Sequence, residues 1–354
     1  MIRFSAVHQF SICMYEGDGI SNSAFFTRKL LTRMGIESRI YAGVVDPRVE
    51  DRVLSYREYV PGKDQLLLIH HGLGNGYENW LFSLPDTRSM VYHNISPARF
   101  FDSSVMHERI AIGRTQLVTW QKDVQSAIAV SNFNRKDLLK AGYTADRVRT
   151  IPLLVDLEEI RNQPFSQDIV EKYAGELVVL FVGNFAPHKS HEDLIDCFYY
   201  FLQMWDRPAR LVLVGGKADS RREALQRYIS RRGLADFVLL TGRVSSRELY
   251  GWYRVADIYL SMSEHEGFGI PLVEAAVFDT PVVAFDAAAV SDTLGEGGLL
   301  VQTKDLRLVA ALLFRLAKDE SLRQVVLSAQ QKNLARFEAD LLQDQLADFL
   351  KNIA

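Results

Sequence analysis

The sequence predicts an α/β protein with two domains, each built on a parallel β-sheet. Short apolar runs of strand length alternate with helix-length segments throughout the chain, which is the pattern of parallel α/β sheets. The 354 residues exceed the roughly 250–300 at which a single hydrophobic core stops growing. With 48% hydrophobic and 24% charged residues, the composition is typical of a soluble globular protein.

The first half of the chain begins with a strand and a helix. Ile2–His8 reads as the strand, and a glycine-rich turn leads from it into a helix from Asn22 to Met34. Later, Ser131 is a favourable N-cap for a helix that Gly142 ends. Between these helices, four further short strands are predicted at Ser38–Ala42, Gln65–His70, Arg88–Tyr92 and Ala127–Val130.

The second half repeats the alternation after a mixed, charged stretch that is typical of a linker. It opens with the apolar run Leu177–Gly183 and ends with an amphipathic helix over Leu341–Ile353. Four more strands, each followed by a helical pattern, are predicted at Arg210–Gly216, Phe237–Gly242, Ile258–Met262 and Pro281–Phe285. We therefore place an N-terminal domain at residues 1–160, a linker at 161–176, a C-terminal domain at 177–335, and at 336–354 a final helical segment that could pack back on the N-terminal domain.

Charge and cysteine content narrow the class of protein. A formal net charge of -3 argues against nucleic-acid binding driven by positive charge. Cys13 and Cys197 fall in different predicted domains without metal-ligand spacing, which favours free thiols in a reducing compartment. The N-terminus lacks the long apolar stretch of a signal peptide, and no run of about 18 apolar residues occurs. We expect a cytoplasmic protein.

The most informative motif runs from Ser263 to Ala275. It follows an apolar strand and passes through two glycines into a helix that is predicted to begin at Pro271, where a missing N–H has no consequence. Glu266 lies on the loop at the strand's carboxyl end, and Glu274 lies about one turn into the helix. Backbone amides at a helix N-terminus bind phosphate oxygens, whereas carboxylates suit sugar and ribose hydroxyls. The combination predicts a nucleotide-sugar site.

A second motif is the segment Gly183–Ser190, which contains Lys189. The segment differs at one position from the phosphate-binding loop of nucleotide triphosphatases, which keeps a phosphotransferase open as an alternative. That loop requires glycine where His188 stands, and Pro187 removes an N–H that would bind the anion. The sequence has no Asp-x-Asp pair of the kind that holds a divalent ion on a diphosphate, so we expect no metal requirement.

Other candidates carry weaker signals. His93 ends a predicted strand, where side chains face a ligand cleft, although a lone histidine is more often structural. Gly17-Asp18-Gly19 is either a phosphate- or acceptor-binding turn or a plain turn. The adjacent histidines 70 and 71 are interpreted as structural or as lining the cleft. A helix containing Phe25, Phe26, Arg28, Lys29 and Arg33 leaves a peripheral membrane contact open, but a core face and a solvated basic face explain the same residues.

Taken together, these motifs make the chain similar to the retaining nucleotide-sugar glycosyltransferases of glycosyltransferase family four. The resemblance covers nearly the whole chain and is densest from Leu177 to Gly298. It implies two Rossmann-like domains that face each other across a cleft, the GT-B architecture. The run Tyr92-His93-Asn94-Ile95-Ser96-Pro97 further resembles bacterial polysaccharide mannosyl- and rhamnosyltransferases.

The resemblance also implies roles for particular residues. Glu274 would bind the ribose and Glu266 the donor sugar, Lys189 would bind the diphosphate, and His93 would face the reacting centre. His93, Glu266 and Lys189 are therefore the candidate catalytic residues. The candidate donor-binding residues are Gly19, Asn184, Lys189, Arg243, Val244, Glu266, Gly267, Phe268, Gly269, Ile270 and Glu274.

The chain departs from the family pattern at three positions. Asn184 stands where an arginine is common, so the phosphate site loses one cation, which Arg243 or His188 could replace. Asp279 replaces a usual glycine, and Asp292 replaces a frequent glutamate. Neither of the last two positions is expected to touch the bond that breaks.

The expected function is transfer of a hexose, with mannose favoured, from a nucleotide diphosphate donor to a glycan or lipid-linked glycan in polysaccharide or lipopolysaccharide biosynthesis. The resemblance implies no cofactor, no metal and no nucleic-acid partner. It implies a cytoplasmic enzyme that could be peripheral at the inner membrane face. Besides the phosphotransferase, a non-catalytic protein that binds sugar nucleotides stays open as an alternative.

Overall fold

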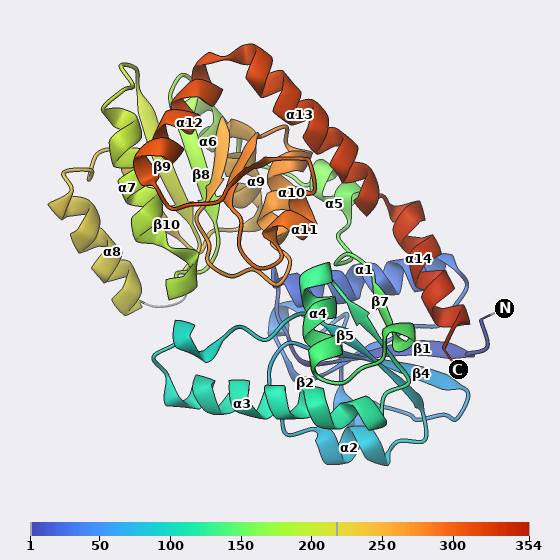
Figure 1. Cartoon of the computed structure of the whole chain (residues 1–354). Coiled ribbons are helices and arrows are strands. Elements are labelled where there is room, and N and C mark those ends of the chain that lie inside the picture. The colour runs from blue at the N-terminus through green and yellow to red at the C-terminus, as the bar shows by residue number, and fades with distance from the viewer. Residues whose placement is uncertain (1, 217–218, 354) are drawn as a thin grey trace. The chain divides into compact units, whose positions relative to one another are not determined.

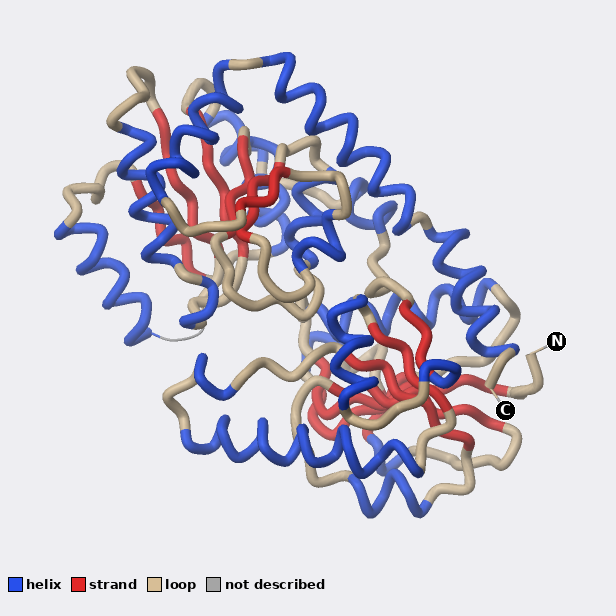
Figure 2. Tube along the Cα trace, viewed as in Figure 1, coloured by secondary structure: helices blue, strands red, loops and turns tan. Residues whose placement is uncertain are grey.

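The computed structural model describes residues 2–216 and 219–353, and the chain divides into two compact units (Figure 1). Unit 1 comprises Met1–Asp156 together with Arg336–Ala354, and unit 2 comprises Leu157–Ala335. In each unit the strands gather into one sheet with helices packed around it, as Figure 2 shows.

Unit 1 is built on a seven-stranded sheet with the order β3-β2-β1-β4-β5-β6-β7, in which all neighbours are parallel. Its strands are β1 (Ala6–Met14), β2 (Ile40–Val45), β3 (Leu54–Ser55), β4 (Gln65–His71), β5 (Thr87–Tyr92), β6 (Ser126–Ala129) and β7 (Val148–Thr150). Its helices are α1 (Gly19–Arg33), α2 (Glu78–Ser83), α3 (Ser104–Thr119), α4 (Asn132–Lys140) and α14 (Ala339–Lys351).

The first strand lies later in the chain than the sequence predicted. The expected strand was Ile2–His8, whereas β1 runs from Ala6 to Met14 and pairs with both β2 and β4. Polar residues such as Gln9, which is fully buried, made this stretch look unlike a core strand. They are tolerated because buried polar groups find hydrogen-bond partners on neighbouring elements.

Unit 2 contains a six-stranded parallel sheet with the order β10-β9-β8-β11-β12-β13. Its strands are β8 (Leu177–Val182), β9 (Ala209–Val214), β10 (Val238–Gly242), β11 (Ile258–Ser261), β12 (Val282–Phe285) and β13 (Leu299–Val301). Its helices are α5 (Leu157–Asn162), α6 (Gln167–Tyr173), α7 (His191–Leu202), α8 (Asp219–Arg231), α9 (Ser246–Val255), α10 (Ile270–Val277), α11 (Val290–Leu294), α12 (Leu306–Lys318) and α13 (Glu320–Leu334).

The two sheets have the apolar strands that parallel sheets require. In β8, for example, Val178, Val179 and Leu180 are fully buried, because helices cover both faces of the sheet. The central strands of both units were predicted for this reason. Since all strands of one sheet run in the same direction, the loops that follow them lie along one edge, where ligands of such sheets bind.

Helix α14 returns to the unit in which the chain began. Its buried residues Leu342, Leu346, Phe349 and Leu350 pack within unit 1, and Arg33 of α1 forms an ion pair with Asp340 at 2.5 Å.

Candidate active site

The lysine motif forms a loop at the carboxyl end of β8. After Val182 the chain makes a single 3₁₀ turn over Pro187–Lys189, and Ser190 then adopts a left-handed conformation with φ of 51° before α7 begins. This turn directs the Lys189 side chain to the neighbouring loop, where its Nζ lies 2.6 Å from Oε1 of Glu266.

Glu266 lies on the loop between β11 and α10, as the sequence predicted. Several backbone contacts hold this loop: the Glu264 N–H donates to the His188 carbonyl at 2.7 Å, and the Glu266 carbonyl accepts from the Ala289 N–H at 3.1 Å. The hydroxyl of Thr293 donates to the Phe268 carbonyl at 2.5 Å. The lysine loop, the glutamate loop and α11 are therefore tied together by hydrogen bonds.

The Lys189–Glu266 pair is largely shielded from water. Only 15% of the Lys189 side chain and 14% of the Glu266 side chain are exposed. Burial by itself would raise the pKa of Glu266, but the charge and hydrogen bond of Lys189, with help from Ser263 and His188, outweigh it and hold this pKa below its usual value. Glu266 is thus a carboxylate at neutral pH, placed beside a cation that can also meet a phosphate.

Glu274 occupies the second turn of α10 and contacts a different group. The hydroxyl of Tyr253, on α9, donates to its Oε2 at 2.7 Å. Burial raises the pKa of Glu274, and the bond from Tyr253 offsets part of that rise. One carboxylate oxygen is therefore fixed by the protein. The described part of the chain donates no hydrogen bond to the other, Oε1, which suits it to a ligand hydroxyl.

Helix α10 begins one residue earlier than predicted, at Ile270, with Pro271 in its first turn and Gly269 as N-cap. Gly269 has φ of 93°, and a Cβ at this position would lie 2.9 Å from Cδ1 of Leu272. Both facts favour glycine here. The first N–H groups of a helix have no partner within the helix, so the start of α10 suits an anion.

The other predicted residues of unit 2 lie on loops along the same edge of the sheet. Asn184 is exposed after β8, where its Oδ1 accepts from the Ala186 N–H at 3.4 Å, and Arg243 and Val244 follow β10. Burial lowers the pKa of His188 to about 4, so its ring is neutral at physiological pH. Of the two residues considered as replacements for the missing arginine, only Arg243 carries a charge.

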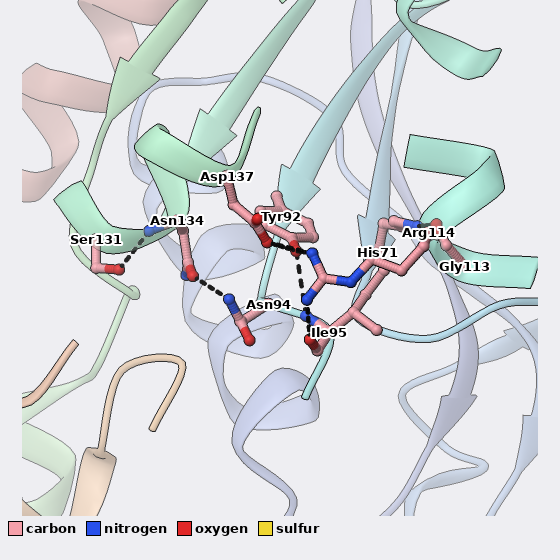
Figure 3. A network of polar contacts seen from close by, with 9 residues as sticks. All are labelled: His71, Tyr92, Asn94, Ile95, Gly113, Arg114, Ser131, Asn134 and Asp137. Carbon is pink, nitrogen blue, oxygen red and sulfur yellow. Dashed lines mark hydrogen bonds and ion pairs between the residues drawn. The ribbon is translucent and has the colours of Figure 1, made fainter. Parts of the chain in front are cut away.

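In unit 1, His93 directly follows β5. Its neighbours Tyr92, Asn94 and Ile95 take part in the network of polar contacts that Figure 3 shows. Asp137 accepts hydrogen bonds from the Tyr92 hydroxyl at 2.6 Å and from Arg114 at 2.5 Å, and Arg114 also donates to the Ile95 carbonyl. Asn94 adopts φ of 81° and donates to Oδ1 of Asn134 at 2.8 Å. The residues around His93 thus fix the backbone from which its side chain projects.

Gly19, the other candidate in unit 1, is the first residue of α1. The preceding Asp18 is the N-cap, and its carboxylate accepts from the Ser21 N–H at 3.1 Å. The Gly17-Asp18-Gly19 turn therefore has a structural role as a helix start.

Sequence reasoning missed several residues that support the candidates. Lys304, which follows β13, places its Nζ 3.0 Å from Oγ of Ser190, 2.7 Å from Oδ2 of Asp193 and 2.9 Å from Oε1 of Glu264, and so joins the two loops. Tyr253 was missed as well, because no local pattern links it to Glu274. His70 also supports a candidate, because its Nδ1 lies 2.8 Å from Nε2 of His93. Of these supporting residues, it alone carried a sequence signal, since it stands near the end of a predicted strand.

Within residues 2–216 and 219–353, no three His, Cys, Asp or Glu side chains come together as a metal site requires. None of the helices in this described part is both long and apolar enough to cross a bilayer.

Comparison with known proteins identifies the second unit. Residues 176–319 match the family model described as "Glycosyl transferases group 1". The O-antigen chain mannosyltransferase B of Escherichia coli is 23% identical over 277 residues, covering 76% of this chain and 68% of that protein. A GDP-mannose-dependent alpha-(1-6)-phosphatidylinositol monomannoside mannosyltransferase of Mycobacterium tuberculosis is 26% identical over 338 residues, covering 92% and 78%. These matches confirm the family resemblance.

Solved structures show the same fold over nearly the whole chain. The Anabaena protein HepE in complex with UDP and glucose superposes with a TM-score of 0.76 at 17% identity, covering 98% of this chain and 99% of that one. Sucrose-phosphate synthase from Thermosynechococcus elongatus gives a TM-score of 0.75 at 18% identity, covering 97% and 98%. The predicted GT-B fold class is therefore confirmed.

Proposed function

Because residues 176–319 form a glycosyl transferases group 1 domain, we propose that this chain transfers a hexose from a nucleotide diphosphate donor to a hydroxyl of a glycan or lipid-linked glycan. Mannose is the favoured sugar and GDP the favoured nucleotide, since mannosyltransferases are among the relatives and one of them is named as GDP-mannose-dependent. A role in polysaccharide or lipopolysaccharide synthesis is part of this proposal.

The ion pair between Lys189 and Glu266 is the observation that carries the proposal. It places a cation suited to a diphosphate directly beside a carboxylate suited to sugar hydroxyls, at the N-terminal end of α10. Glu274, about one turn into that helix, would hold the ribose through the oxygen that Tyr253 does not contact. A carboxylate that accepts from hydroxyls makes hydrogen bonds about twice as strong as neutral ones.

In the proposed reaction the acceptor hydroxyl attacks the anomeric carbon on the face from which the diphosphate leaves. The bond from that carbon to the phosphate oxygen breaks, a bond to the acceptor oxygen forms, and the acceptor's proton passes to the leaving phosphate oxygen. Lys189 and the amides of α10 stabilise the charge that develops on the diphosphate. The configuration is retained, and no metal is needed because Lys189 supplies the positive charge.

The proposal is tested with purified protein and a panel of GDP-, UDP-, ADP- and dTDP-sugars. We expect one of them to raise the melting temperature, and a suitable acceptor to cause nucleoside diphosphate release that EDTA does not prevent. NMR of the product should show the anomeric configuration of the donor. Stabilisation by ATP with magnesium alone, or no response to any sugar nucleotide, would contradict the proposal.

A further inference from the structure

Lys304, in the loop after β13, connects several elements at the carboxyl edge of the unit 2 sheet. Its Nζ lies 3.0 Å from Oγ of Ser190, 2.7 Å from Oδ2 of Asp193 and 2.9 Å from Oε1 of Glu264. An ammonium group has three N–H donors, so each of them has an acceptor here. The side chain is 22% exposed, and its Nζ lies 5.2 Å from the ring centre of Phe285, the last residue of β12. One side chain therefore reaches from β13 across β12 to the loop after β11 and to the start of α7.

Ser190 is the unusual partner of Lys304, because it does not behave as an ordinary N-cap. A serine that caps a helix normally has an extended backbone, and its hydroxyl accepts from an N–H of the first turn, as Ser131 and Ser245 do in this chain. Ser190 is the N-cap of α7, but φ of 51° and ψ of 50° place it in the left-handed region, and its side chain forms no capping bond. A residue with a Cβ adopts this conformation at a cost that glycine avoids. Its hydroxyl contacts Lys304 instead.

The conformation of Ser190 determines where Lys189 points. Ser190 joins the 3₁₀ turn Pro187–Lys189 to α7, and its N–H donates to the Pro187 carbonyl at 3.0 Å. Rotation of Ser190 into the right-handed helical region would change its φ and ψ by about 100° each. The preceding turn would then leave the neighbourhood of Glu266, whose Oε1 lies 2.6 Å from Nζ of Lys189. An interaction that favours the left-handed state therefore also favours the Lys189–Glu266 pair.

Glu264 gives Lys304 a second connection to the same pair. It lies two residues before Glu266, its N–H donates to a carbonyl of the lysine loop at 2.7 Å, and its carboxylate accepts from Lys304. Lys304 thus contacts both loops, at Ser190 next to Lys189 and at Glu264 near Glu266. Because its three donors are already used, a direct bond to a phosphate would require one of these bonds to break. Two of its acceptors are carboxylates, which repel a phosphate.

We propose that Lys304 is a positioning residue that holds Ser190 in the left-handed conformation and thereby keeps Lys189 directed at the diphosphate of the bound donor. The step from Lys189 to the diphosphate rests on the proposed function, whereas the support of Ser190 by Lys304 belongs to the free protein. Lys304 itself does not touch the donor. Its loss should therefore be compensated by a change that lets residue 190 adopt the left-handed state unaided.

Ser190→Gly provides that change, because glycine adopts the left-handed conformation without help. In Lys304→Met we expect the dissociation constant of GDP to rise about tenfold, the effect of one lost hydrogen bond. On the Ser190→Gly background the same substitution should raise it by less than about threefold. Titration calorimetry on the full chain measures both. An equal rise on the two backgrounds overturns the proposal, because a lysine that bound the phosphate directly would be needed whichever residue stands at position 190.

Arg210→Met is the matched control, because Arg210 is a similarly shielded cation at the opposite edge of the same sheet. It lies near the start of β9 with 24% of its side chain exposed, and it donates to Oε2 of Glu176 at 2.8 Å and to the Asp236 carbonyl at 3.1 Å. Its loss does not affect Ser190, so the affinity for GDP should stay the same. A loss of affinity equal to that in Lys304→Met would show a general effect of removing such a cation and count against the proposal.

Ser190→Ala keeps the proposal testable even if Lys304→Met does not fold. It retains the Cβ but removes the hydroxyl that Lys304 contacts, so nothing offsets the cost of the left-handed conformation. We expect GDP to bind Ser190→Ala more weakly than Ser190→Gly. Equal affinity in these two variants would mean that the left-handed turn needs no support, and the proposal would then be wrong.

Hydrogen exchange provides a readout in the free protein. The N–H groups of Asp193 and Leu194 donate to the Ser190 carbonyl at 3.1 and 3.3 Å, so their exchange reports on this turn. Lys304→Met should speed it about tenfold, and by less on the Ser190→Gly background. Equal acceleration on both backgrounds contradicts the proposal without any donor present. If the wild type binds no GDP, the proposed donor fails, and the exchange measurement still decides whether Lys304 supports Ser190.

Discussion

At the scale of single residues, the two glutamates of unit 2 have opposite electrostatic environments. Glu266 is paired with Lys189 and has a lowered pKa, whereas Glu274 contacts the neutral hydroxyl of Tyr253 and has a raised pKa. Donor binding should therefore weaken in acid first through Glu274, because a protonated carboxyl group accepts less well from a ribose hydroxyl.

The substitution Tyr253→Phe tests this difference. The hydrogen bond from Tyr253 lowers the pKa of Glu274, so its loss should raise that pKa further above its ordinary value. We expect the pH below which nucleoside diphosphate affinity declines to move upward, with affinity well above that pH changed little. Titration calorimetry at a series of pH values measures the shift.

Tyr250→Phe is the control for this experiment. Tyr250 also lies on α9. Burial and the nearby charge of Glu274 raise the pKa of Tyr250, but no hydrogen bond joins the two side chains in the described structure. Loss of the Tyr250 hydroxyl should leave unchanged the pH below which nucleoside diphosphate affinity declines. Equal displacement in both variants would show that Glu274 does not depend on the Tyr253 hydroxyl.

A second prediction concerns the contribution of the Lys189–Glu266 pair to the free energy of unfolding. Lys189→Met leaves a shielded carboxylate without its cation and should lower the free energy of unfolding at pH 7 by about 1–3 kcal/mol. Because the folded pKa of Glu266 is lowered, the wild-type pair stabilises the fold above the unfolded pKa and loses that effect as pH falls through the folded value. Urea titrations at pH 7 and pH 4 should therefore show a smaller difference between wild type and variant in acid.

The double variant Lys189→Met with Glu266→Gln separates charge from packing. It removes the unpaired carboxylate, so it should recover part of the stability lost in Lys189→Met at pH 7. It should not recover nucleoside diphosphate binding, which needs the cation. A double variant as unstable as the single one would show that the pair contributes through packing alone.

At the scale of elements, strands were easier to predict than the contacts between them. Runs such as Leu177–Val182 could be predicted because strands that are buried on both faces are apolar throughout. β1 was misplaced because the polar residues Gln9 and Ser11 lie within it. The Gln9 side chain finds its partner on another element, the Ala24 carbonyl of α1, whereas the Ser11 hydroxyl donates to the Cys13 carbonyl of the same strand. Local sequence carries the apolar periodicity, but it does not show which polar residue will meet a partner after folding.

The turn before α10 yields the third prediction. Gly269→Ala places a Cβ against Leu272 in a left-handed conformation, so we expect a loss of about 1 kcal/mol in stability and weaker nucleoside diphosphate binding. Gly233→Ala is the matched control: its φ of 68° is also positive, but a Cβ there would meet nothing within 4 Å. Denaturation should show a loss in both variants, and only Gly269→Ala should lose affinity. Unchanged affinity in Gly269→Ala would argue against an anion at this helix start.

At the scale of the whole molecule, the order of motifs in the sequence indicated which residues form the site. It did not indicate which residues from elsewhere in the chain contact them. Glu266, Gly269 and Glu274 could be placed around a helix start because they are close in sequence. Lys189 and Tyr253, which contact the two glutamates, and Lys304, which contacts Glu264 of the same loop, come from loops and helices that only the parallel sheet brings near. Lys189 was found through the family resemblance, and the other two carried no signal, since a tyrosine or lysine has the same local pattern whether or not it holds a glutamate.

The last prediction concerns the contribution of α14 to the stability of unit 1. Removal of residues 336–354 would expose the surface under Leu342, Leu346, Phe349 and Leu350, each of which is buried. Burying one such side chain stabilises a fold by about 1.5–3 kcal/mol, so the four together are comparable with the whole stability of a domain, roughly 5–15 kcal/mol. We therefore expect the truncated protein to lose the fold of unit 1 while unit 2, which contains Lys189, Glu266 and Glu274, still forms. Hydrogen exchange should then be fast in β1 and β4 and remain slow in β8 and β9, with nucleoside diphosphate still slowing exchange in α10. Full protection of β4 in the truncated chain would mean that unit 1 is stable without its returning helix.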